Sequence, residues 1–236
     1  MWTVSTSEAQ IVSLSHVTPR DGYHHGNLRE ALVDAAVELA GTSGPEGVVL
    51  RAVTRHVGVS PNAAYRHFAD REALLAEVAA RAMAALTRSM SARQDAVTEQ
   101  DPVDRAVARL EAIGRGYVDF ALAEPGLFRV CFAAPPEVAL AWDSRDADAD
   151  AEAGAGEVPE PTADPFGVLN AALDHLVEVG WLDPVRRPGA EVLCWSTVHG
   201  FATLHLDGPL RDVSAQEREQ ALSMALAHVS RGIGPA

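Results

Sequence analysis

Apolar residues recur every three or four positions along most of the chain, and no segment alternates apolar and polar residues over a strand's length. This period is typical of helices with one buried face and predicts an all-α fold. The first predicted helix begins at Asn27, an N-cap that forms a capping box with Glu30, and ends at Gly41. Its buried face carries Leu28, Leu32, Ala35 and Leu39.

Two short helices are predicted next, with a tight turn between them. The first spans Leu50–Val57, and Gly58 suits the left-handed conformation that often follows a helix. Ser60 is expected at the N-cap of the second and Pro61 at its first position, where a missing N–H group costs nothing. This helix is predicted to end near His67. The spacing is that of a helix-turn-helix.

The sequence after residue 69 predicts a larger helical domain. Asp70 is expected to cap a long helix, whose buried stripe comprises Leu74, Leu75, Val78, Ala82 and Leu86. Further helices are predicted over residues 102–123, 127–132, 165–179, 188–206 and 214–231. Residues 23–69 would then form an N-terminal three-helix domain, and residues 70–236 a C-terminal helical domain.

Two segments lack a helical period. Residues 1–22 are expected to form a flexible N-terminal arm. Residues 135–164 are acidic and rich in Ala and Pro, a composition that buries too little apolar surface to order itself. We therefore expect a mobile acidic loop there.

Composition narrows the class of protein. Hydrophobic residues make up 47% of the chain, the longest apolar runs are interrupted by Arg, Glu or His, and the N-terminus has no basic region followed by an apolar one. No membrane span and no signal peptide are predicted, so a cytoplasmic protein is expected. Cys131 and Cys194 form no CxxC pair, and neither a disulfide framework, a metal site nor another cofactor is expected.

Charge is unevenly distributed. The formal net charge is −14, yet the segment from Arg20 to Arg71 contains six arginines and six acidic residues and is neutral. All 19 basic residues are arginine, whose planar, fork-shaped donors suit phosphate and guanine. A local basic face near residues 51–71 is therefore compatible with an acidic protein.

The helix-turn-helix carries side chains suited to DNA. Asn62 lies at the start of the second helix, where it can pair with an adenine edge. Tyr65, His67 and Arg71 follow, where the helix would pass the sugar-phosphate strand, and each can donate to phosphate oxygens. Arg51 is placed to reach a guanine or a phosphate. The alternative, a helical hairpin with a polar surface, leaves this row of donors unexplained.

Three stretches resemble the TetR (tetracycline-repressor) family of transcriptional regulators. GVSPNAAYRHFADREALL, residues 58–75, resembles the family's operator-reading motif, and YHHGNLREALVDAAVELA, residues 23–40, resembles its first helix. CWSTVHGFATLHLDGPL, residues 194–210, resembles the "WHG" C-terminal domain of one branch of the family.

The resemblance implies a homodimeric regulator. Each subunit would place one reading helix in a major groove of a palindromic operator, and a small hydrophobic effector bound in the C-terminal domain would release the repressor. By their place in the motif, the residues that read bases would be Arg51, Asn62, Ala63 and Arg66. The residues that hold phosphates would be Tyr65, His67 and Arg71. Ser60 would start the reading helix as its N-cap. Such families usually place Ser or Thr at the N-cap of the helix before the reading helix. This chain has Val49 there, which puts a side-chain cap on that helix in question.

The C-terminal domain offers two further sets of residues. Trp195, His199 and Gly200 are assigned to a dimer interface rather than to a catalytic or metal site, because no carboxylate lies at ligand spacing. The resemblance implies a hollow between the later helices, and the candidates for its lining are Phe120, Phe128, Phe132 and Phe166. The alternative for these phenylalanines is an ordinary core.

Two other functions remain open beside a ligand-released repressor. One is an architectural DNA-binding protein without a ligand, which a cavity filled by side chains would favour. The other is an enzyme that uses Cys194 and His199, against which stands the lack of a nucleophile–base–acid set at plausible spacing. The sequence favours the regulator over the enzyme.

Overall fold

The computed structural model describes residues 28–133 and 164–235, and within these ranges every regular element is a helix. The predicted all-α fold is therefore confirmed. The predicted arm and most of the predicted acidic loop lie outside the described residues. No helix in the described part of the chain is long and apolar enough to cross a membrane.

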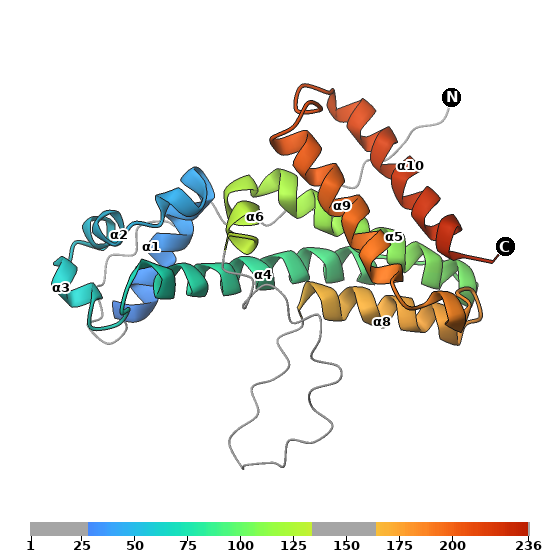
Figure 1. The fold of residues 1–236 in the computed structure, drawn as a ribbon, viewed down its shortest axis with the longest axis horizontal. Coiled ribbons are helices and arrows are strands. Elements are labelled where there is room, and N and C mark those ends of the chain that lie inside the picture. Colours follow the sequence, from blue (N-terminus) through green and yellow to red (C-terminus); the bar gives the residue numbers. More distant parts are fainter. Residues whose placement is uncertain (1–27, 134–163, 236) are drawn as a thin grey trace, which may run out of the picture.

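The N-terminal part, here called the head, is built from α1 (Leu28–Ser43), the 3-10 turn η1 (Gly44–Gly47), α2 (Leu50–Val57) and α3 (Pro61–Ala64). It forms the left end of the molecule in Figure 1. Gly58 ends α2 with φ 79°, the left-handed conformation that its place in the sequence predicted. Helix, glycine turn and short helix follow one another as a helix-turn-helix requires.

The reading helix is shorter than predicted. It ends at Ala64, and the backbone N–H groups of His67 and Phe68 both donate to the Ala64 carbonyl, at 2.9 and 3.0 Å. The following turn brings Phe68 into the core, where the side chain is only 3% exposed. Tyr65, Arg66 and His67 therefore lie on a turn and not on a regular helix.

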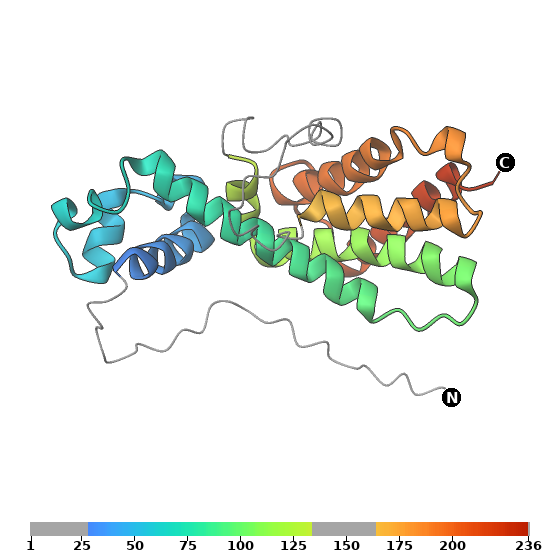
Figure 2. The same cartoon turned by 90° about the horizontal axis from the view of Figure 1, so that it is seen from below.

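Helix α4 (Arg71–Asp95) joins the head to the rest of the molecule. The Asp70 side chain accepts a hydrogen bond from the backbone N–H of Ala73 at 2.8 Å, as its predicted N-cap role requires. The predicted stripe is buried in full: Leu74, Leu75, Val78, Ala82 and Leu86. Figures 1 and 2 show α4 running out of the head and along the C-terminal domain.

The C-terminal domain adds α5 (Pro102–Ala123), α6 (Pro125–Cys131), α8 (Pro165–Glu178), the short η2 (Pro184–Arg186), α9 (Ala190–Leu206) and α10 (Ala215–Ile233). Local signals set most of these boundaries. Asp101 and Asp164 cap α5 and α8 through their side chains, and Ser214 forms a full capping box with Glu217 at α10. Helix α9 begins two residues later than predicted, after Gly189 in a left-handed conformation with φ 83°.

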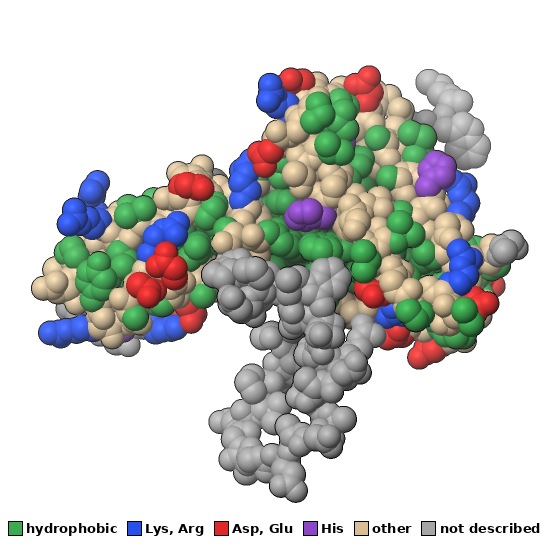
Figure 3. All heavy atoms as spheres, viewed as in Figure 1, with side chains coloured by type: hydrophobic (Ala, Val, Ile, Leu, Met, Phe, Trp, Pro, Cys, Tyr) green, Lys and Arg blue, Asp and Glu red, His purple; other side chains and the backbone are tan. Residues whose placement is uncertain are grey.

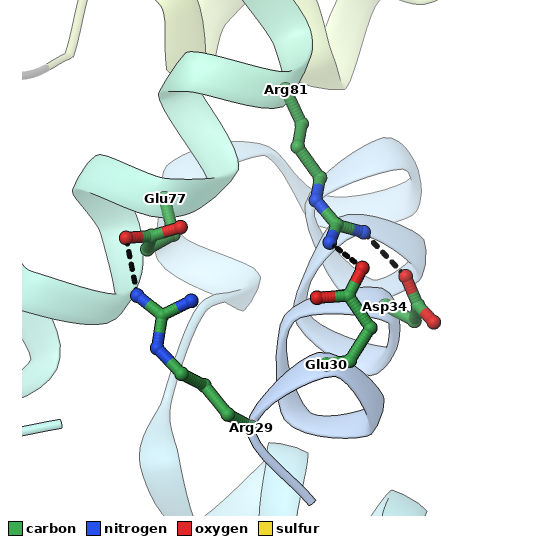
Figure 4. Close-up of polar contacts among 5 residues, drawn as sticks. All are labelled: Arg29, Glu30, Asp34, Glu77 and Arg81. Atoms are coloured by element: carbon green, nitrogen blue, oxygen red, sulfur yellow. Dashed lines mark hydrogen bonds and ion pairs between the residues drawn. The ribbon is translucent and has the colours of Figure 1, made fainter. Parts of the chain in front are cut away.

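Ion pairs fasten α1 to α4 (Figure 4). Arg29 pairs with Glu77 at 2.5 Å, and the Arg81 guanidinium binds both Glu30 and Asp34. Beneath them, the Arg29 guanidinium also lies 5.2 Å from the ring centroid of Phe68. The predicted capping partner of Glu30, Asn27, lies outside the described residues.

Candidate DNA-binding surface and ligand cavity

The predicted DNA-reading side chains gather on one face of the head. Arg51 on α2 and Asn62 on α3 are exposed, as are Tyr65, Arg66 and His67 on the turn that follows. Tyr65 is 57% exposed, which is unusual for an aromatic side chain without a partner. Among the described residues, no hydrogen bond or ion pair engages these five side chains. Their donors are therefore available to an external partner.

Sequence reasoning left out one member of this face. Arg55, in the last turn of α2, is exposed one helical turn beyond Arg51. The i, i+4 spacing of the two arginines was a signal that could have identified it. Figure 3 shows arginine side chains around this end of the molecule, with acidic side chains among them.

Neither Val49 nor Ser60, at the starts of the two short helices, makes a side-chain capping hydrogen bond. Val49 is the N-cap of α2 and makes no side-chain capping hydrogen bond, so the cap that its identity put in question is absent. Ser60 occupies the N-cap of α3, as predicted, but its hydroxyl makes no capping bond and is exposed. Pro61 occupies the first turn of α3.

Arg71 has a structural role that the sequence did not predict. Its Nε donates to the carbonyl of Val48 at 2.8 Å, and its Nη2 donates to the carbonyl of Pro45 at 2.5 Å. The guanidinium thus ties the start of α4 to the connection between η1 and α2. Two of its donors are committed inside the head, and its contact with phosphate stays a prediction.

A cavity lies within the C-terminal domain and is partly open to solvent; about 640 Å³ of unoccupied space, open solvent included, lies between its walls. Its wall comes from α4, α5, α8, α9 and α10, together with Phe132 just after α6. Most of the lining is apolar, including Met83, Leu86 and Met90 from the second half of α4. An apolar wall of this kind is typical of a small-molecule site.

Two of the four phenylalanines expected to line a ligand pocket lie at this cavity. Phe132 and Phe166 line the cavity, whereas Phe120 and Phe128 do not. The cavity stripe on α5 ends at Tyr117, so Phe120, one turn later, is buried elsewhere in the core. The Phe128 ring packs edge-on against Tyr117 with centroids 5.7 Å apart, and fills space behind that ring.

The rings of Trp195 and His199 pack against other aromatic rings of the same chain. Trp195 lines the cavity, its ring centroid 5.2 Å from that of Phe166, and the His199 ring lies 4.8 Å from that of Phe132. Gly200 differs, because nothing lies within 4 Å of the position that a Cβ would take. The two rings therefore belong to the interior, and Gly200 belongs to the open face of α9.

A chain of hydrogen bonds orders this aromatic cluster. Trp195 Nε1 donates to the Tyr117 hydroxyl at 3.3 Å, and that hydroxyl lies 2.8 Å from His199 Nδ1. Burial lowers the pKa of His199, which favours a neutral imidazole whose Nδ1 can accept a hydrogen bond from the Tyr117 hydroxyl. Burial also raises the pKa of the Tyr117 phenol, which keeps it protonated.

The geometry does not support an enzyme centred on Cys194. The thiol is buried, and burial together with nearby Glu191 raises its pKa to about 11, so it is neutral near pH 7. His199, its proposed partner, is engaged by Tyr117. The described residues also contain no cluster of His, Cys, Asp and Glu able to hold a metal ion.

Helix α6 connects the cavity region to the head. A Cβ at Gly126 would overlap the carbonyl oxygens of Ala40 and Gly41 at the end of α1, so only glycine allows this approach. Six residues later, Phe132 forms part of the cavity wall. One short segment therefore contacts both the head and the cavity.

Comparisons with known proteins agree with this architecture. A family model described as "Bacterial regulatory proteins, tetR family" matches residues 32–78, and one described as "Tetracyclin repressor-like, C-terminal domain" matches residues 110–229. The second match spans Trp195, His199 and Gly200. The match is consistent with the branch of the family that has a WHG-type C-terminal domain, which the spacing of these three residues suggested.

One curated relative is YobS of Bacillus subtilis (strain 168), described as an uncharacterized HTH-type transcriptional regulator. It is 33% identical over 103 residues, which cover 44% of this chain and 50% of that protein. The match thus extends over about half the length of the relative.

Solved structures share the fold. A Rhodococcus sp. RHA1 protein of unknown function superposes with a TM-score of 0.66 at 24% identity, over 90% of this chain and 98% of that one. A putative tetR family regulator from Shewanella sp. PV-4 gives 0.57 at 17% identity, over 88% and 98%. A TetR variant from Acinetobacter baumannii AYE in complex with minocycline gives 0.54 at 18% identity, over 86% and 94%.

Replacing Arg71 by lysine separates its two possible roles. Lysine keeps a positive charge for phosphate but cannot form the fork that binds the Pro45 and Val48 carbonyls. We expect Arg71→Lys to lower the free energy of unfolding by about 1–3 kcal/mol, measured by thermal or urea unfolding without DNA. Arg66→Lys is the matched control, because Arg66 has no partner among the described residues, and it should unfold like the wild type. Equal stability of both variants and the wild type would contradict the structural role of Arg71.

Proposed function

The chain belongs to the TetR family of transcriptional regulators, and from this we propose that it is a homodimeric repressor, released from a palindromic operator by a small apolar effector. It is a DNA-binding regulator and not an enzyme. Acting on DNA would place it in the cytoplasm. The observation that carries the proposal is the row of exposed, unengaged donors across α2, α3 and the turn after α3.

The placement of this row supports the proposed division of labour. Asn62 lies in the first turn of α3, the part of a reading helix that meets base edges. Tyr65 and His67 lie past its end, where a strand of DNA would pass. Arg51, Ala63 and Arg66 complete the proposed base-reading set. Arg71 would add a phosphate contact through Nη1, which makes no backbone bond and lies 3.6 Å from the Glu72 carboxylate.

A second copy would bind the outer face of α9 and α10. Val192, Leu193 and Leu204 on α9 are between 44% and 47% exposed, and Met224 on α10 is 58% exposed. Gly200 lies on the same side of α9, and its bare backbone would let another helix approach closely. An exposed set of large apolar side chains at helical spacing favours burial against a partner.

The open cavity supports an effector. It argues against an architectural protein without a ligand, for which a filled interior was expected. The minocycline complex of the Acinetobacter relative is a precedent for a small molecule bound by this fold. A molecule bound at Phe132 or at the second half of α4 would act on elements that also contact the head. It needs to favour the DNA-incompetent arrangement by only a few kcal/mol to change occupancy.

Selection of bound fragments from the source organism's DNA tests the proposed DNA binding. On the selected operator, Asn62→Ala should cost about 1–3 kcal/mol and relax preference at one base pair in each half-site. Tyr65→Phe should weaken binding to all sequences alike, because it removes a phosphate donor. Fluorescence anisotropy with operator and scrambled DNA measures both effects. Failure to select a palindrome, or unchanged selectivity of Asn62→Ala, would contradict the assignment.

Sedimentation tests the proposed dimer. Leu193→Glu places a charge in the proposed apolar interface and should convert dimers to monomers at micromolar concentration. Val185→Glu is the matched control, since Val185 is 86% exposed on η2, outside the face of α9 and α10. Dimers that survive Leu193→Glu, or monomers produced equally by Val185→Glu, would exclude this face.

A further inference from the structure

The surface that the cavity presents to an occupant is almost entirely apolar. The oxygen-bearing side chains of the wall are Glu111, Tyr117 and Ser230, and each is hydrogen-bonded within the protein. The Ser230 hydroxyl donates to Glu111 Oε1 at 2.6 Å, and the Tyr117 hydroxyl is shared between Trp195 and His199. A polar group of an occupant would therefore find almost no partner on this wall.

Such a wall disfavours polar and charged occupants. A hydroxyl that enters it loses hydrogen bonds to water without replacing them, and an ionised group loses far more. The Cys194 thiol, which also lines the cavity, offers only a weak donor. The surface of the cavity thus selects for a compound that carries no charge and has few hydrogen-bonding groups.

The rings and sulfur atoms of the wall favour an aromatic occupant over a saturated one. The Trp195 ring centroid lies 5.2 Å from that of Phe166 and 6.3 Å from that of Phe132, and all three residues line the cavity. Met83 and Met90 on α4 line the same cavity and bring their thioether groups to it. Ring–ring and sulfur–ring contacts stabilise an aromatic compound beyond the effect of the apolar area that it buries.

From this surface we propose that the effector is an uncharged aromatic compound of hydrocarbon character, bound against the rings of Phe132, Phe166 and Trp195. The proposal rests on the proposed function and specifies the chemical class of its ligand. The hydrogen bond between Tyr117 and His199 is part of the selectivity, because it pairs the polar groups beside the rings with each other. The ligand then has no hydrogen-bond partner to supply.

Compounds of similar shape and different polarity test this class directly. Titration calorimetry at pH 7 compares ethylbenzene, benzyl alcohol, benzylammonium and benzoate against the full-length protein. We expect ethylbenzene to bind roughly 10-fold more tightly than benzyl alcohol and about 100-fold or more tightly than either ion.

The outcomes separate the ligand class from the proposed function. Equal or tighter binding of benzyl alcohol or of either ion would overturn the uncharged apolar class. If that compound also weakens binding of the selected operator, a ligand-released regulator still stands. Absence of binding by all four compounds would overturn the ligand class as well, whatever the DNA selection shows.

A saturated analogue tests the preference for an aromatic ring. Ethylcyclohexane is compared with ethylbenzene after each affinity is divided by the compound's partition coefficient between hexadecane and water, which removes the difference in hydrophobicity. We expect the corrected affinity of ethylbenzene to be about 3-fold or more higher. Equal corrected affinities in the wild-type protein would overturn the aromatic preference.

A pair of variants locates this preference. Phe166→Leu removes a ring from the cavity wall and should at least halve the corrected ratio of ethylbenzene to ethylcyclohexane affinity, since ring–ring contacts are lost (roughly 2-fold or more). Phe201→Leu is the matched control, because Phe201 is also partly buried but stacks on His205 outside the cavity wall, and it should keep the wild-type ratio. An unchanged ratio in Phe166→Leu would overturn the role of this ring. The wild-type comparison stands as a test even if a variant misfolds.

Discussion

The molecule depends on the continuity of α4, a single helix whose two halves are buried in different places. Its first half is capped by Asp70, carries Leu74 and Leu75 into the head and is fastened to α1 through Arg81. Its second half, from Met83 onward, forms a wall of the cavity. In the proposed mechanism, an occupant that displaces the second half of this 25-residue helix would also displace the first half, because both halves are packed. Helix α6 offers a parallel contact, because glycine at 126 lets it lie directly on α1.

Local signals in the sequence predicted most of the elements. Caps such as Asp70 and Ser214, the left-handed Gly58 and the helical period of the apolar residues act within a few residues of one another, so they can be identified without tertiary structure. The same reasoning placed Tyr65 and Asn62 on an exposed face, because that face is exposed wherever a helix-turn-helix forms.

The remaining features depend on which helices become neighbours. The contacts of Trp195 with Tyr117 on α5 and Phe166 on α8 could not be predicted from the spacing that suggested an interface. The bonds from the Arg71 guanidinium to the carbonyls of Pro45 and Val48 were likewise not predictable, because the partners lie more than 20 residues earlier in the chain. Phe120 continues the period of the cavity stripe on α5, yet the cavity ends one turn before it.

The central claim is that occupancy of the cavity and binding of DNA oppose each other within one protein. By thermodynamic linkage, a ligand that weakens DNA binding must itself bind more weakly when DNA is present. The two factors are equal, and they are typically about 5- to 150-fold. The most direct measurement is the dissociation constant of the selected operator with and without a saturating apolar ligand of the cavity, at constant ionic strength. The account predicts that the ligand weakens operator binding and that operator DNA weakens ligand binding by the same factor. Equal operator affinity in both conditions would contradict it.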